Sequence, residues 1–278
     1  MFQKQFHKDS DAISFDRKHR STIDFNIGRY DAAVAKGKTR YKDLEAARTI
    51  AASIKRDVLT NWADYLLEFE RNCTASGAEV LWAKDSEEAS SLLRSIIREQ
   101  QAKLIVKSKS MTTEEIELNH LAADEGCESL ETDLGEFIVQ VAGEKPYHIV
   151  TPAMHKSKED IAALFHEKFG THPDDDPVKL THFVRELLRK KYVSADIGVT
   201  GANFLVADTG SISVTENEGN AILSTAFPKV HVVIAGIEKL VPKLHQLGLM
   251  YQVLASHGTG QQITAYNTLF TGPRKEGE

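Results

Sequence analysis

The chain has very few cysteines. Its 278 residues include two, Cys73 and Cys127. They lie far apart in the sequence, and neither has a partner at the spacing of metal ligands. These residues therefore cannot hold a cysteine-ligated cluster by themselves. The sequence predicts that both are small buried apolar side chains and are not joined in a disulfide.

Long apolar runs and an excess of basic residues are also missing. No run approaches the roughly 20 apolar residues that cross a bilayer, and the polar first ten residues lack the core of a signal peptide. We therefore expect no transmembrane segment and a cytoplasmic location. The chain carries 40 acidic against 34 basic residues, a net charge of -6. This balance opposes phosphate binding, so we expect no nucleic-acid partner.

Common site motifs are absent as well. The sequence contains no Gly-x-Gly-x-x-Gly, no Gly-x-x-x-x-Gly-Lys-[Ser/Thr] and no Gly-x-Ser-x-Gly, which argues against the usual nucleotide-binding and hydrolase sites. The 11 histidines are scattered. Asp174 to Asp176 lacks the alternating ligand spacing of a calcium loop. We expect no metal site in this chain.

What is present begins with a helical N-terminal arm. Apolar residues recur at helical spacing from Asp43 to Ser76, and Gly77 supplies a stop. This pattern predicts one long amphipathic helix. The stretch before it mixes charges with scattered apolar residues and favours one or two further helices, so we assign residues 1–77 to an arm.

After Gly77, β-rich runs alternate with helical ones, which is typical of an α/β fold with a mostly parallel sheet flanked by helices. We assign residues 78–271 to this domain and 272–278 to a linker. The predicted strands are 79–82, 104–106, 127–131, 148–150 and 230–235, with a hairpin of 204–207 and 211–215. The predicted helices begin at Ser86, at Thr112 with Glu115 as a capping box, and span 137–141, 158–169, 177–192 and about 242–247.

Three polar segments follow predicted strands, where parallel sheets bind ligands. Lys107 to Ser110 offers two ammonium groups and two hydroxyls to a small anion. Thr200 to Asn203, with Asp208 and Thr209 close behind, has small residues that let a ligand approach the backbone. Glu216 to Asn220 offers carboxylates that act as nucleophile or base when partly desolvated. A solvated turn, a pair of structural turns and a loop held by Asx-turns are the respective alternatives.

We expect these segments to line one polar cleft. The catalytic candidates are Glu216 and Glu218. The ligand-binding candidates are Lys107, Ser108, Lys109, Thr132, Asp133, Thr200, Gly201, Ala202, Asn203, Asp208, Thr209, Gly219 and Asn220.

Six ordered motifs give the sequence a family resemblance that covers essentially the whole chain. It resembles the LUD-domain family of lactate utilisation proteins, in particular the B proteins. The motifs are Lys107-Ser-Lys-Ser-Met111, Glu131-Thr-Asp-Leu-Gly-Glu136, Asp196-Ile-Gly-Val-Thr-Gly-Ala-Asn203, Glu218-Gly-Asn220, Gly236-Ile-Glu-Lys239 and Thr259-Gly-Gln261.

The resemblance implies a fold like that of the NagB, RpiA and CoA-transferase proteins. It also implies a cytoplasmic complex that oxidises L-lactate to pyruvate, whose other subunits would be the partners. Long forms of the family carry [4Fe–4S] clusters in a C-terminal ferredoxin-like segment, and this chain stops before it. We expect a truncated fragment or a natural short form with no cofactor of its own, which binds or docks and does not catalyse alone.

Two alternatives stay open. Glu216-Asn217 resembles the segment in which CoA transferases carry a nucleophilic glutamate, although Glu218 interrupts the pattern. An acyl-handling enzyme is therefore one alternative. A non-catalytic scaffold with a vestigial pocket is the other.

Overall fold

Two four-stranded sheets form the centre of the molecule in the computed structural model, which describes residues 2–147 and 150–274. The first, sheet A, is parallel throughout, with the order β2-β1-β3-β6. This confirms the predicted α/β class and parallel sheet. Its strands are β1 (Leu104–Lys107), β2 (Glu128–Glu131), β3 (Ile197–Thr200) and β6 (Val230–Val233).

The second sheet, sheet B, is mixed. Its order is β7-β4-β5-β8, with β4 parallel to β7 and β5 antiparallel to both β4 and β8. The β4–β5 pair is the predicted hairpin, whereas β7 and β8 were not predicted. The strands are β4 (Phe204–Val206), β5 (Ser211–Glu216), β7 (Leu240–Val241) and β8 (Tyr266–Phe270).

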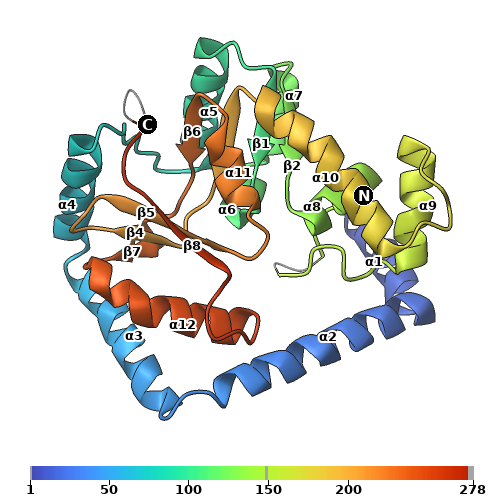
Figure 1. Ribbon diagram of the computed structural model, residues 1–278, viewed down its shortest axis with the longest axis horizontal. Helices are drawn as coiled ribbons and strands as arrows, with labels where there is room; N and C mark the ends of the chain where they lie inside the picture. The colour runs from blue at the N-terminus through green and yellow to red at the C-terminus, as the bar shows by residue number, and fades with distance from the viewer. Residues whose placement is uncertain (1, 148–149, 275–278) are drawn as a thin grey trace.

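Helices surround both sheets (Figure 1). The α-helices are α1 (Phe2–Ser14), α2 (Arg17–Lys38), α3 (Leu44–Thr60), α4 (Trp62–Ala75), α5 (Ser86–Glu99), α6 (Met111–Glu115), α7 (Leu118–Asp124), α8 (Leu134–Ala142), α9 (Lys158–Phe169), α10 (Pro177–Ser194), α11 (Asn220–Ala226) and α12 (Leu247–Gly258). Two short 3-10 helices, η1 (Ile237–Lys239) and η2 (Leu244–Gln246), flank β7. No helix of the described part is long and apolar enough to cross a membrane.

The side chains of β1 alternate between the two faces of sheet A, and each face packs against a different hydrophobic cluster. Leu104 and Val106 face the cluster formed with α8, α9 and α10, while Ile105 faces the cluster formed with α5 and α7. Because successive side chains of a strand point to opposite faces, Lys107 falls on the Ile105 side. The strand therefore directs an ammonium group into the interior.

The N-terminal helices α3 and α4 share a core with sheet B. Ile54 of α3 packs with Phe204 and Val206 of β4 and with α12, and Phe69 and Cys73 of α4 pack against the other side of β4. Helix α2 runs beside α12 (Figure 1). Cys73 and Cys127 are free and buried, as predicted.

The single long helix predicted for Asp43 to Ser76 is wrong, because the chain breaks at Asn61. The Asn61 side chain donates to the backbone and the carboxylate of Asp57, which ends α3. Asparagine competes in this way for local backbone groups and favours helix ends. The apolar spacing stayed in phase across the break, so periodicity alone did not reveal it.

Three further predictions fail and one cannot be compared. The helix predicted at about 242–247 is a 3-10 helix at 244–246, and α12 begins only at Leu247. Residues 79–82 form no strand. The Trp82 side chain donates a hydrogen bond to Glu70 of α4, so the segment contacts a helix and not a neighbouring strand. Thr112 and Glu115 form no capping box, because α6 starts after Ser110 and ends at Glu115. The strand predicted at 148–150 includes residues 148 and 149, which lie outside the described residues.

The packing of α11 on β3 requires glycine at position 198. A Cβ there would lie 1.8 Å from the Ser224 carbonyl oxygen. We expect Gly198→Ala to lower the free energy of unfolding by about 3 kcal/mol through overpacking. Gly248→Ala is the control, because apart from its chain neighbours and its own helix backbone nothing lies within 4 Å of that Cβ. Thermal melts of both variants test this, and equal melting temperatures would contradict it.

Candidate functional site

The carboxyl ends of the sheet A strands meet at one edge, here called the rim. Lys107 ends β1 beside Glu131, which ends β2, and Thr200 ends β3 beside Val233 of β6. The loops that leave β1 and β3 begin with two of the predicted polar segments, whereas the third, Glu216 to Asn220, follows β5 of sheet B. Parallel order thus gathers residues that are distant in sequence, as the rule for open α/β sheets anticipates.

Lys107 is fully buried and lies between two carboxylates. Its Nζ is 2.7 Å from Glu114 Oε1 and 2.5 Å from Glu131 Oε1, and Asn119 donates to the same Glu131 oxygen at 3.0 Å. Burial alone lowers the pKa of Lys107, but Glu131 and Glu114 outweigh it and the pKa is raised. The ammonium therefore stays charged and is already neutralised, so it is not free to bind an anion.

Glu136, in the first turn of α8, adds a third carboxyl group to this cluster. Only 2% of its surface is exposed, and burial together with the neighbouring Glu131 carboxylate raises the pKa of Glu136 to about 9. Two like unit charges about 4 Å apart repel by about 4 kcal/mol at an effective dielectric constant near 20, so a second carboxylate beside Glu131 is disfavoured. Glu136 is accordingly a neutral acid at neutral pH.

Lys109 and Asp133 form a second ion pair, nearer the surface. Their Nζ and Oδ2 atoms are 3.3 Å apart, and the Lys109 side chain is 30% exposed. Asp133 also caps α8 by accepting from the backbone of Gly135 and Glu136. Lys109 is therefore the rim lysine that solvent reaches.

Thr132 joins the rim to the loop that contains Glu216 and Glu218. Its hydroxyl donates to the Lys107 carbonyl at 2.8 Å and accepts from Asn220 Nδ2 at 3.4 Å. Ser224 Oγ lies 3.3 Å away. Tyr192 hydrogen bonds to the same side chain, and burial raises the pKa of Tyr192 to about 12. The Lys107 turn and the Asn220 end of the loop therefore lie on the same side of the molecule.

The two candidate glutamates differ in their surroundings. Glu216 is buried, and its oxygens accept from the backbone of Ala221 at 2.7 Å and Ile222 at 3.0 Å, at the start of α11. Burial raises the pKa of Glu216 despite these bonds. Glu218 is exposed. In this arrangement Glu216 anchors a helix, with both oxygens engaged.

Residues after β3 are held mainly by structural contacts. Thr200 Oγ1 lies 2.8 Å from His231 Nε2, and burial lowers the pKa of His231 to about 4, so the imidazole is neutral. A Cβ at Gly201 would lie 2.7 Å from Ser110 Oγ. Asn203 accepts from the Thr215 backbone within the hairpin. Gly201 thus brings β3 and the Lys107–Ser110 turn into contact.

Asp208 and Thr209 lie at the other end of the hairpin. Asp208 accepts from the Leu244 backbone, and Gly210 packs against Cys73 of α4. With about 3.3 Å per strand residue, Asp208 is roughly 16 Å along the chain from Asn203. Asp208 and Thr209 therefore lie at the opposite end of the hairpin from Asn203, and hairpin geometry explains why neighbours in sequence separate.

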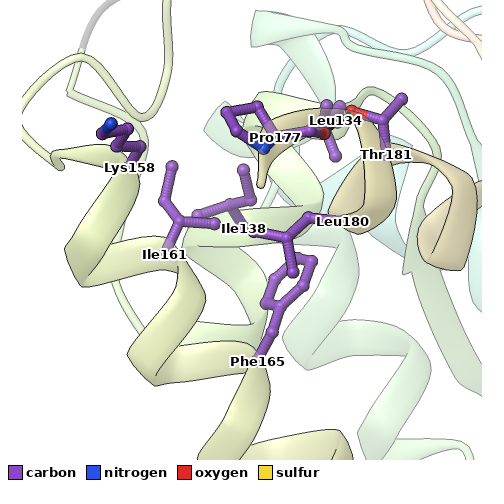
Figure 2. Close-up of a pocket in the computed structure, with 8 residues that line it drawn as sticks. All are labelled: Leu134, Ile138, Lys158, Ile161, Phe165, Pro177, Leu180 and Thr181. Atoms are coloured by element: carbon purple, nitrogen blue, oxygen red, sulfur yellow. Dashed lines mark hydrogen bonds between the residues drawn. The ribbon is translucent and has the colours of Figure 1, made fainter. Parts of the chain in front are cut away.

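An apolar hollow lies between α8, α9 and α10 (Figure 2). Its volume is about 80 Å³, below the roughly 300–1,000 Å³ of typical ligand pockets. Apart from Lys158 and Thr181, its lining is hydrophobic, and no candidate residue contributes. We interpret it as a packing gap. It is lined by Leu134, Ile138, Lys158, Ile161, Phe165, Pro177, Leu180 and Thr181.

The described residues do not fit a metal or an iron–sulfur cluster. Across 2–147 and 150–274, no three His, Cys, Asp or Glu side chains gather as metal ligands. Cys73 packs beside sheet B and Cys127 beside sheet A, so the cysteines cannot act together.

Sequence reasoning missed several residues around the rim. Glu136 closes a motif that was noted, but nothing in its spacing showed that it would reach Glu131. Glu114 and Asn119 come from short helices whose directions depend on tertiary packing. The missed residues are Glu114, Asn119, Glu136, Tyr192, Ser224 and His231.

Comparison with known proteins assigns most of the chain to one family. The family model described as LUD domain matches residues 66–278. This chain belongs to the LUD domain family. The matched range includes Lys107, Glu131 and Thr200, which end three strands at the rim. No solved structure matches the chain.

Curated relatives of this LUD domain chain carry the name Lactate utilization protein B. One from Bacillus subtilis strain 168 is 41% identical over 275 residues, covering 95% of this chain and 57% of the relative. Another, from Geobacillus thermodenitrificans strain NG80-2, is 44% identical over 235 residues, covering 84% and 49%. The chain thus spans about half the length of the curated relatives it matches.

Proposed function

We propose that this chain is the LUD domain of an electron-transfer subunit that acts in cytoplasmic L-lactate utilisation. The observation that carries the proposal is the identity of 41% over 95% of the chain to a Lactate utilization protein B. In this proposal the chain binds or docks within a complex of further subunits and does not oxidise lactate alone.

The [4Fe–4S] clusters of the proposed system would lie outside this chain. The two buried cysteines cannot ligate them, and the relatives are about twice as long as the matched region. This part of the proposal rests on the family resemblance. Domain bounds of 1–77, 78–271 and 272–278 remain part of the same proposal.

Within the LUD domain, we place the binding of a small carboxylate at Lys109. Lys107 is neutralised by Glu114 and Glu131, whereas Lys109 has a single carboxylate partner and is partly exposed. A charged hydrogen bond contributes about 1.5–3 kcal/mol, so losing it would weaken binding roughly tenfold to a hundredfold. The acyl-transfer alternative has less support, because backbone groups occupy both oxygens of Glu216.

A genetic complementation experiment tests the proposal. The complete gene is expressed in a bacterium that lacks its own Lactate utilization protein B and depends on L-lactate for growth. We expect the natural gene to restore growth, Lys109→Ala to restore it poorly and Lys109→Arg to restore it in part. Lys158→Ala, an exposed lysine on α9, is the matched control and should behave as wild type.

The outcomes separate the two parts of the proposal. If the natural gene is well expressed and growth does not return, the lactate role is wrong. If the natural gene and Lys109→Ala support equal growth at equal protein levels, the lactate role stands and the Lys109 site is wrong.

A further inference from the structure

The carboxyl groups of Glu131 and Glu136 each have a buried oxygen without a hydrogen bond in the described part of the chain. Both residues are at least nine-tenths buried, and they lie within hydrogen-bonding reach of each other. Glu131 Oε1 is occupied by Lys107 and Asn119. Glu131 Oε2 and Glu136 Oε2 are buried and accept no hydrogen bond from the residues that the structure describes. Two carboxylates cannot bond to one another without a proton between them.

The ammonium beside the pair is already neutralised, so it does not attract a further anion to Glu131 and Glu136. Lys107 is the one ammonium in contact with the pair among the described residues, and it already serves Glu114 and Glu131. Lys109 lies nearer the surface and pairs with Asp133, which caps the helix that carries Glu136. Lys107 of β1 and Asp133 at the start of α8 are the charged groups that act on the pair, and Glu114 of α6 shares Lys107 with it.

A metal ion does not suit this position. Calcium takes six to eight oxygen ligands, and magnesium requires near-octahedral coordination. Glu131 Oε1 is already committed to Lys107 and Asn119, and the Lys107 ammonium beside the pair repels a cation. A proton needs only two oxygens and carries no shell of further ligands.

The geometry points to a buried proton-binding site in which Glu136 keeps its acid proton and donates it to Glu131 Oε2. Glu131 then accepts from Lys107, Asn119 and Glu136 at once, and the chain of hydrogen bonds ties β1, α7, β2 and α8 together. Release of the proton to solvent leaves both carboxyl groups ionised, with no change in any bond to carbon. The added repulsion loosens the contact of α8 with the rim.

Infrared spectroscopy of the whole protein tests this site directly. A protonated carboxylic acid has a C=O stretching band that carboxylates lack and that shifts in D₂O. We expect wild-type protein at neutral pH to show such a band. Glu136→Gln should lose it, because glutamine still donates to Glu131 but carries no acid. Glu115→Gln, an exposed glutamate of α6, should keep it.

An NMR titration of the glutamate side chains provides a second test and uses wild-type protein alone. Glutamate labelled with ¹³C at the side-chain carboxyl is followed by NMR, so folding of a variant is not required. One carbon should keep the chemical shift of an acid through neutral pH and titrate near pH 9. The site is disproved if every glutamate carbon reports a carboxylate at neutral pH. It is equally disproved if the infrared band survives in folded Glu136→Gln.

Discussion

Lys107→Met is expected to lower the free energy of unfolding by about 3–5 kcal/mol, the usual cost of removing one partner from a buried ion pair. Methionine fills a similar volume, so the loss reports charge and not a cavity. The change leaves Glu131, which is almost fully buried, without its ammonium partner. Urea denaturation at neutral pH measures the effect through the transition midpoint.

Lys109→Met is the matched control for Lys107→Met. The same substitution is made two residues away in an ion pair that is partly exposed, where such pairs contribute about 1 kcal/mol or less. The double variant Lys107→Met/Glu131→Gln should recover part of the loss, because the stranded charge is removed as well. Equal losses in the two single variants would show that Lys107 does not hold the rim together.

Glu136→Gln is expected to make stability less dependent on pH. In the unfolded chain a glutamate releases its proton near its ordinary pKa of 4.5, whereas Glu136 in the folded protein keeps it until about pH 9. The folded state therefore binds more protons between these values, and the stability from this group is complete at low pH and is lost as pH rises. The slope approaches about 1.4 kcal/mol per pH unit.

The measurement compares urea unfolding of wild type and Glu136→Gln at several pH values from 5 to 9, with Glu115→Gln as the control at an exposed position. We expect the stability of Glu136→Gln relative to wild type to increase steadily with pH. Glu115→Gln should follow the wild-type curve. If Glu136→Gln also follows that curve, Glu136 is ionised in the folded protein.

Local signals predicted several elements well. Asp176 followed by Pro177 predicted the start of α10, and its cap bond to the Lys179 backbone is present. Helix α9 has the predicted bounds of 158–169. The hairpin was also predicted from the residues of its turn, which include Gly210. In the structure this glycine adopts a positive φ of 64°, a conformation that glycine adopts readily. Caps and turns involve residues a few positions apart, so the sequence displays them directly.

Elements whose existence depends on distant partners were harder to predict. Strands β7 and β8 are short and lie far from β4 and β5 in sequence. Conversely, residues 79–82 have the composition of a strand, yet α4 holds Trp82. A strand forms only where a neighbouring strand pairs with its backbone, and the tertiary fold decides which segments become neighbours.

The sequence by itself determined the α/β class, most helix positions and the places where polar residues follow strands, because these depend on periodicity and local capping. Only the tertiary structure decided that Lys107 and Glu131 stand side by side in register and that Glu136 reaches them. It also decided that Lys109, and not Lys107, faces solvent. The ion pairs Lys107–Glu131 and Lys109–Asp133 each join residues 24 positions apart, and no local pattern encodes them.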